Sequence, residues 1–147
     1  MQDLEKAKSM LRDGGYTCVL CKGDTTHTSC HRGVRPLLEL LETDVSGFCA
    51  ADKVVGKATA LLYCLLDVKV VHAQVISQAA LQVLQNSLIA VTWDTQVEYI
   101  KNRTGDGRCP MEQATEGIDD PQEALVAIRR KLNELSMAAG ASPRPTD

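Results

Sequence analysis

Apolar residues recur at helical spacing at the start of the chain. Leu4, Ala7 and Leu11 share one face of the segment at residues 3–13, and two glycines follow this segment directly. A stripe at this spacing with a glycine stop is typical of an amphipathic helix that ends where the glycines begin. We therefore predict a helix over residues 3–13.

The pattern then changes from the helical period to a β-rich one and back. Residues 16–22 and 25–31 are both β-rich, with a glycine-containing turn between them, and they predict a β-hairpin. Residues 36–42 hold four leucines and begin with Pro36. Because proline is favoured in the first helical turn, this segment predicts a short helix.

The most apolar part of the chain covers residues 52–76. Within residues 52–66 the apolar side chains form a wide stripe that predicts a helix buried against a sheet. The stripe consists of Val54, Val55, Ala58, Leu61, Leu62, Leu65 and Leu66. Residues 68–76 are mostly apolar, as in a strand that is covered on both faces. Ser77 is a favoured N-cap residue, and we expect it to begin a helix that runs to Asn86.

Three further elements are expected in the last third of the chain. Within residues 88–93 the large side chains Ile89, Val91 and Trp93 stand at alternate positions and predict a strand, and Pro110 begins a short helix. Residues 120–123 read Asp-Pro-Gln-Glu, which combines an N-cap, a proline at the first helical position and a capping-box glutamate. The helix that they begin is predicted to bury Leu125, Ile128, Leu132 and Leu135.

The resulting order is helix, hairpin, helix, helix, strand, helix, strand, loop and helix. Strand–helix–strand alternation after an opening hairpin predicts the α/β class, with a mixed sheet and helices on both of its faces. The 147 residues match the commonest size of one domain, so we expect a single domain over residues 1–137. Residues 138–147 are small, polar and proline-bearing, and we predict a disordered tail there.

Composition narrows the classes of partner. The net charge is −3, and Phe48 and Trp93 are the single Phe and Trp of the chain. Such a chain lacks the basic field and the stacking platform of nucleic-acid-binding proteins, so nucleic acid is disfavoured as a partner. No stretch resembles a signal peptide or a membrane span, which predicts a cytoplasmic protein without a membrane partner. The sequence does not set the oligomeric state, and a homo-oligomer stays open.

Three stretches of the chain carry a family resemblance. Residues 14–20 read Gly-Gly-Tyr-Thr-Cys-Val-Leu, and residues 50–58 read Ala-Ala-Asp-Lys-Val-Val-Gly-Lys-Ala. The third stretch, at residues 102–114, contains Asn-Arg-Thr and then Cys-Pro-Met-Glu-Gln-Ala. Together they resemble an uncharacterised prokaryotic family, a domain of unknown function whose fold is cytidine-deaminase-like. The resemblance covers residues 3–135 and implies a three-layer α/β/α fold without an established activity.

Zinc-dependent deaminases give a chemical comparison. They bind zinc through H-x-E or C-x-E at one helix start and through P-C-x-x-C at the next. Here residues 50–52, at the expected start of the first core helix, read Ala-Ala-Asp, and residues 77–80 read Ser-Gln-Ala-Ala. Zinc-hydroxide attack needs three protein ligands and an open fourth position. We therefore expect no ordinary deamination, no metal and no cofactor.

A cluster of cysteines and histidines near the hairpin invites a zinc interpretation. Cys18 and Cys21 form C-x-x-C, and His27, Cys30 and His31 follow. However, a zinc knuckle needs a tight turn between its cysteines, whereas these two lie on a predicted strand. Their odd spacing points them to opposite faces of the sheet, so we expect reduced thiols here and no metal site.

The strongest candidate site is the loop at residues 102–112. Its glycines let backbone N–H groups converge, its arginines add positive charge, and the helix start after it attracts anions such as phosphate. Cys109 lies near the N-cap, where these charges favour a thiolate. We hypothesise that an anionic or nucleotide-like small molecule binds here, although an ordinary surface turn with an inert thiol stays open. The binding residues of this hypothesis are Lys53, Asn102, Arg103, Thr104, Gly105, Gly107, Arg108 and Glu112.

Asp52 is the second candidate. It can act as a general base or bind a ligand hydroxyl or amine, or it can simply be the N-cap of the helix predicted at residues 52–66. Three functions follow: a small-molecule-binding domain without zinc, a metal-independent enzyme with Cys109 as nucleophile and Asp52 as acid/base, or a protein-interaction module. The enzyme requires Asp52 and Cys109 to share one pocket. His72, on a predicted buried strand, is expected to be a hydrogen-bonded core histidine.

Overall fold

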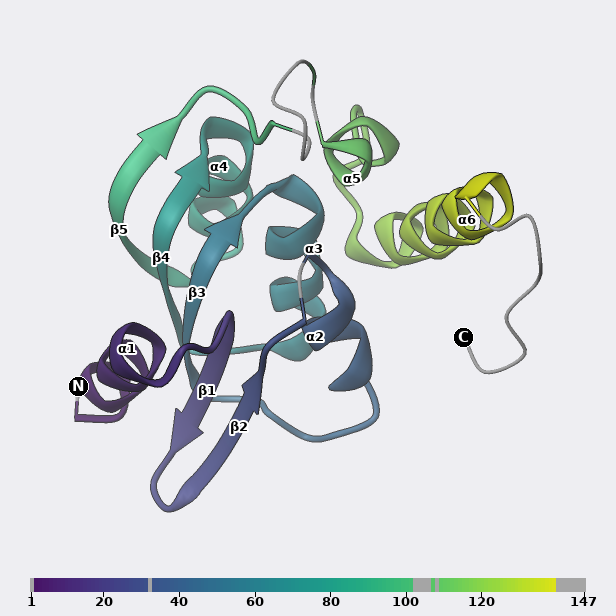
Figure 1. The fold of residues 1–147 in the computed structure, drawn as a ribbon. Coiled ribbons are helices and arrows are strands. Elements are labelled where there is room, and N and C mark those ends of the chain that lie inside the picture. Colours follow the sequence, from purple (N-terminus) through teal and green to yellow (C-terminus); the bar gives the residue numbers. More distant parts are fainter. Residues whose placement is uncertain (1, 32, 102–106, 108, 140–147) are drawn as a thin grey trace.

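A mixed β-sheet forms the centre of the molecule (Figure 1). This computed structural model describes residues 2–31, 33–101, 107 and 109–139. Within these residues the sheet has the strand order β2-β1-β3-β4-β5. β1 pairs antiparallel with β2 and β3, whereas β3, β4 and β5 run parallel. The strands are β1 (Cys18–Lys22), β2 (Thr25–Ser29), β3 (Cys49–Val55), β4 (Val70–Ser77) and β5 (Ala90–Val97). The predicted mixed sheet of an α/β protein is confirmed.

Helices lie against both faces of this sheet (Figure 1). On one face Leu11 packs with Val19 and Ala51. On the other face the larger core joins Leu61 and Leu84 to the strands. The helices in the described residues are α1 (Gln2–Gly14), α2 (Arg35–Glu39), α3 (Lys57–Leu66), α4 (Gln78–Asn86), α5 (Pro110–Ala114) and α6 (Pro121–Ala139).

The prediction of one helix over residues 52–66 is wrong. Residues 49–55 form β3, Gly56 follows, and α3 begins only at Lys57. Neighbouring strands flank β3 on both sides, and helices lie on both faces of the sheet. Its mostly apolar sequence therefore resembles that of a buried helix. Asp52 consequently lies within a strand and is not the N-cap of α3, which is Gly56.

Two predicted helix starts are confirmed in atomic detail. The Ser77 hydroxyl accepts a hydrogen bond from the Ala80 N–H at 3.1 Å, which caps α4. The Asp120 carboxylate accepts one from the Glu123 N–H at 3.0 Å at the start of α6. In both cases a side-chain oxygen satisfies a backbone donor that has no partner within the helix.

Other predicted limits and burials need correction. β5 begins at Ala90 and not at residue 88, because the backbone of Leu88 is left-handed (φ 62°) and its side chain is exposed. Leu132 and Leu135 of α6 were predicted to be buried but are exposed, because this helix extends away from the sheet (Figure 1). α6 ends at Ala139, and the rest of the predicted tail, residues 140–147, lies outside the described residues.

The predicted placements of Cys18, Cys21 and His72 are confirmed. Every cysteine is a free thiol, and Cys18 and Cys21 belong to cores on opposite faces of the sheet. No group of three metal-binding side chains occurs among the residues that the structure describes. His72 is buried, and its Nδ1 lies 2.7 Å from the Thr92 Oγ1. No helix in the described ranges is both long and apolar enough to cross a bilayer.

Candidate ligand-binding cleft

A cleft of about 1130 Å³ opens at the start of α3. Segments that are far apart in the sequence line it, from the residue before β1 to α6. The lining residues are Thr17, Cys30, His31, Gly33, Val34, Arg35, Pro36, Asp52, Lys53, Val54, Gly56, Ala58, Thr59, Ile100, Lys101, Cys109, Pro110, Met111, Glu112, Leu132 and Leu135. We call this surface the cleft.

Residues from both candidate sites meet in the cleft. Asp52 and Lys53 line it from β3, and Cys109 and Glu112 line it from the start of α5. The shared pocket that the enzyme hypothesis required is therefore geometrically possible. Gly107 is described but does not line the cleft. Five further residues named in these hypotheses lie outside the described residues, namely Asn102, Arg103, Thr104, Gly105 and Arg108.

Asp52 is a buried acid in the cleft wall. Only 7% of its surface is exposed. One carboxylate oxygen accepts a hydrogen bond from the Tyr63 hydroxyl at 2.7 Å, and the other accepts one from the Val54 N–H at 3.4 Å. Burial raises the pKa of Asp52 to about 7, although these hydrogen bonds act in the opposite direction. Near neutral pH the carboxyl group is therefore present both protonated and ionised.

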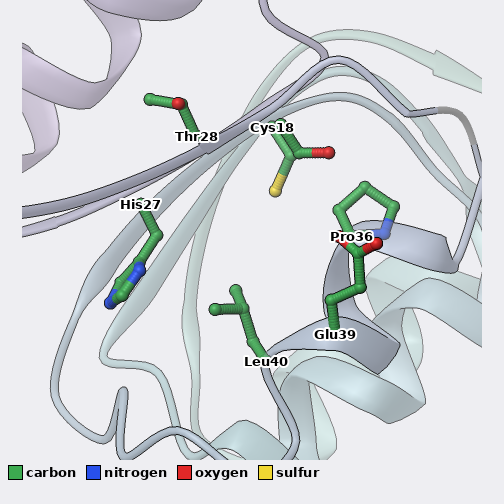
Figure 2. Close-up of a pocket in the computed structure, with 7 residues that line it drawn as sticks. Cys18, His27, Thr28, Pro36, Glu39 and Leu40 are labelled. Carbon is green, nitrogen blue, oxygen red and sulfur yellow. The ribbon is translucent and has the colours of Figure 1, made fainter.

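Tyr63 connects Asp52 to Cys18. The Cys18 sulfur lies 3.4 Å from the Tyr63 hydroxyl oxygen. Burial, and next the charge of Asp52, raise the pKa of the Cys18 thiol well above its usual value. Figure 2 shows this sulfur pointing into a separate pocket of about 80 Å³, between β2 and α2. A chain of hydrogen-bonding groups thus joins a small pocket to the cleft, and Cys18 is a poor nucleophile in it.

Glu112 holds the start of α3 from α5. Its side chain is buried with 3% exposed, and its Oε1 accepts a hydrogen bond from the Lys57 N–H at 3.4 Å. A Cβ atom on Gly56 would lie only 2.7 Å from this oxygen, so the close approach depends on glycine. A carboxylate at this position faces the positive end of the α3 dipole, which stabilises it.

Cys109 lies at the start of a short helix. It is the N-cap of α5, it is half-buried, and its N–H donates to the Ile100 carbonyl at 2.8 Å. α5 has only 5 residues, whereas α3 has 10. Because the macrodipole sums over aligned peptide units, α3 provides the stronger positive helix end in the cleft.

Charge is divided between the inside and the outside of the cleft. The acids Asp52 and Glu112 are buried, and with Thr59 they form what we call the floor. The cations Arg35, Lys53 and Lys101 are exposed, and we call them the rim. The arrangement can accept hydrogen bonds from a ligand inside the cleft and attract an anionic group outside.

Sequence reasoning missed Tyr63, Thr59 and the rim residues Arg35 and Lys101. Tyr63 and Thr59 are polar groups within the apolar stretch of α3, and both are buried. That position was a usable signal, since buried polar groups normally need a partner. No local pattern in the sequence relates Arg35 or Lys101 to Asp52.

Comparison with known proteins identifies the family. A model of the TM1506 family, described as a domain of unknown function (DUF1893), matches residues 6–132. The chain belongs to the DUF1893 family. The solved structure of a DUF1893 family protein (TM1506) from Thermotoga maritima is similar to this one, with a TM-score of 0.82 and 25% sequence identity. The match covers 88% of this chain and 90% of that chain. No curated protein matches.

Membership of the DUF1893 family confirms the resemblance to a domain of unknown function, and it brings no activity. The cytidine-deaminase-like character of the fold stays a prediction. The comparison with zinc deaminases must be shifted, because α3 begins after Gly56 and not at residue 50. The corrected start, Gly-Lys-Ala-Thr at residues 56–59, contains neither histidine nor cysteine.

Proposed function

We propose that the cleft binds a small anionic molecule of nucleotide-like character. The observation that carries the proposal is that Asp52, Lys53, Cys109 and Glu112 line one cleft. Its volume of about 1130 Å³ is of the order of small-molecule sites, which typically measure about 300–1,000 Å³.

The distribution of polarity supports this class of ligand. Buried carboxyl groups on Asp52 and Glu112 accept hydrogen bonds from hydroxyl or amino groups. The exposed Lys53 and Lys101 bind an anionic group such as phosphate at the rim. Leu132 and Leu135 add an apolar wall. A nucleotide combines these features in one molecule, with donors on its base or sugar and a phosphate at one end.

Thermal unfolding against nucleosides, nucleotides and phosphorylated metabolites tests the proposal. A ligand at a hundred times its Kd adds about 2.7 kcal/mol, and each kcal/mol raises the midpoint by roughly 2–4 °C for a chain of this size. We expect a phosphorylated ligand to raise the midpoint of unfolding, and Lys53→Ala, Lys101→Ala or Arg103→Ala to reduce this rise. Lys69→Ala is the matched control, because Lys69 is exposed and does not line the cleft. A rise in the midpoint that survives all three substitutions contradicts the proposal.

A second candidate function is a metal-independent enzyme with Asp52 as the acid/base and Cys109 as the nucleophile. The pKa of Asp52, near 7 because of burial, favours it, since a general acid/base works best when its pKa is near the working pH. Loss of turnover with retained ligand affinity in Asp52→Asn and Cys109→Ser supports the enzyme. Alkylation of Cys109 at the rate of a free model thiol, with no protection by ligand, counts against a reactive nucleophile.

A further inference from the structure

The start of α3 leaves backbone donors without partners inside the cleft. Gly56, its N-cap, has no side chain to offer. Of the first three N–H groups of α3, only that of Lys57 meets an acceptor among the described residues, and this acceptor is the Glu112 carboxylate. For the N–H groups of Ala58 and Thr59, no acceptor lies within hydrogen-bonding distance in the described part of the chain. Both residues line the cleft.

The Thr59 side chain is an independent second observation. Only 5% of Thr59 is exposed, and it lines the cleft. Its hydroxyl makes no hydrogen bond to any residue that the structure describes. Thr115 is a useful contrast, because it is also buried and its hydroxyl donates to the Met111 carbonyl at 2.9 Å. Since buried polar groups are almost always paired, the unpaired Thr59 hydroxyl is available to form a hydrogen bond with a ligand in the cleft.

Acceptors face the cleft beside these donors. The buried carboxyl groups of Glu112 and Asp52 line the same cleft, and Glu112 already contacts the first N–H of α3. A phosphate or carboxylate placed on the α3 donors would lie close to the Glu112 carboxylate and be repelled by it. A neutral carbonyl oxygen accepts the same hydrogen bonds without that repulsion.

We propose that the floor of the cleft binds a neutral amide-type group. Its carbonyl oxygen accepts hydrogen bonds from Thr59 and the start of α3, and its neighbouring N–H donates to Glu112 or Asp52. A free carboxamide and the lactam edge of a heterocycle both present this pair of groups. The inference rests on the proposed function in using the same cleft, and it assigns the anionic part of that ligand to the rim and the amide-type part to the floor.

The decisive probes are benzamide and benzoate, which have the same shape and differ in charge and in the N–H donors. We expect benzamide to shift the backbone amide resonances of Ala58 and Thr59 in two-dimensional NMR, and benzoate to leave them unchanged. Uracil serves as the lactam probe. Binding of both uracil and benzamide shows that the floor recognises any amide-type group, and binding of one alone shows whether it recognises the lactam or the free carboxamide. Equal binding of benzoate, or shifts confined to other residues, overturns the proposal.

Substitutions then assign the donors and acceptors. Thr59→Val removes the hydroxyl at nearly constant volume and should weaken benzamide binding about fivefold to tenfold, the loss expected for one hydrogen bond. Thr95→Val, at an exposed position of β5 outside the cleft, should leave it unchanged. Glu112→Gln should admit benzoate, because it removes the repelling charge. Unchanged affinity in Thr59→Val overturns the assignment.

Two controls separate possible failures. Thr59→Ser keeps the hydroxyl and should bind benzamide, so it distinguishes a lost hydrogen bond from altered packing if Thr59→Val is poorly folded. Benzamide and uracil carry no anionic group that could form an ion pair with the rim cations. If these probes bind but no nucleotide raises the midpoint of thermal unfolding, the proposed function alone is contradicted. If a nucleotide binds but benzamide does not shift the amide resonances of Ala58 and Thr59, this inference alone is contradicted.

Discussion

Asp52 shows how one buried side chain can determine the chemistry of a cleft. Its carboxyl group lies between the Tyr63 hydroxyl and the Val54 N–H, with little exposure to water. Burial opposes ionisation more strongly than these donors favour it, which explains the pKa near 7. The protonation state of Asp52 therefore links the stability of the fold to pH and to any ligand that donates a hydrogen bond to it.

Replacing Asp52 by Asn should change how stability depends on pH. The folded-state pKa of about 7 lies above the ordinary value of 3.8. Protonated Asp52 therefore makes its full contribution to the free energy of unfolding below that ordinary value, and the wild-type chain loses this contribution as the pH rises through 7. Asn does not titrate. Relative to wild type, the free energy of unfolding of Asp52→Asn should increase by on the order of 4 kcal/mol between about pH 4 and pH 8. Urea unfolding of both proteins across this range measures it, and parallel curves would contradict the assignment.

Replacing Tyr63 by Phe should raise the pKa of Asp52 further. The Tyr63 hydroxyl donates to the Asp52 carboxylate at 2.7 Å and lowers its pKa, so removing the hydroxyl disfavours the charged form. The carboxyl carbon shift of Asp52, followed by NMR against pH, reports the midpoint directly. Tyr99→Phe is the control, since Tyr99 does not line the cleft. An unchanged midpoint in Tyr63→Phe would rule out this hydrogen bond in solution.

At the scale of elements, the junction between β3 and α3 positions the floor of the cleft. A single residue, Gly56, joins the strand to the helix, and its small size admits Glu112 and Ile100. The strand therefore supplies Asp52, the helix supplies Thr59, and α5 closes over the junction with Glu112. An acid from a separate helix caps α3 in place of a local N-cap side chain.

Adding a methyl group at this junction should separate α3 from α5. In Gly56→Ala the new Cβ lies 2.7 Å from the Glu112 Oε1 and 3.2 Å from the Ile100 Cγ1, so the carboxylate must leave the Lys57 N–H. We expect a loss of about 1–2 kcal/mol in the free energy of unfolding. A double-mutant cycle with Glu112→Ala provides the check: in that background Gly56→Ala should cost less, and strict additivity would show that the two residues do not interact.

The sequence predicted some elements well and failed at this junction for a physical reason. Capped helices such as α4 and α6 carry local signals at Ser77 and Asp120, which the structure confirms. β3 carries no such signal, because a central strand with helices on both faces loses the alternation of polar and apolar residues. Recognising Gly56 as a break between two elements would have separated β3 from α3.

The candidate site was only partly accessible to sequence reasoning. Asp52 was named as a possible general base at a predicted helix start, and Glu112 as part of the loop at residues 102–112; both line the cleft. Their juxtaposition depends on how α5 returns to the start of α3, which no local pattern encodes. Thr59 and Tyr63 were missed because they read as part of an apolar helix, although both are buried.

At the scale of the whole molecule, the sheet has one protected centre and two edges. β3 and β4 each have a strand on either side, whereas β2 and β5 are the edge strands. All residues of β5 are exposed or only half-buried. Local opening at β5 therefore exposes little apolar surface and should be easier than opening of the central strands.

Hydrogen exchange should reveal this difference along the sheet. We expect the amides of β3 and β4 to exchange only when the whole chain unfolds, because these strands are paired on both sides. Alternate amides of β5 face away from β4 and should exchange as fast as those of loops. Residue-resolved exchange by NMR measures both sets. Equally slow exchange at every β5 amide would show that another strand or another copy of the chain covers this edge.

The distance along the chain between Thr59 and Glu112 also has a consequence for synthesis. A ribosome adds about 5–20 residues per second, so roughly 3–10 s separate the appearance of Thr59 from that of Glu112. During this interval the nascent sheet carries the start of α3 without its carboxylate partner. The cleft, and the part of the core that Met111, Ala124 and Ile128 supply, can therefore be completed only after α5 and α6 have been synthesised.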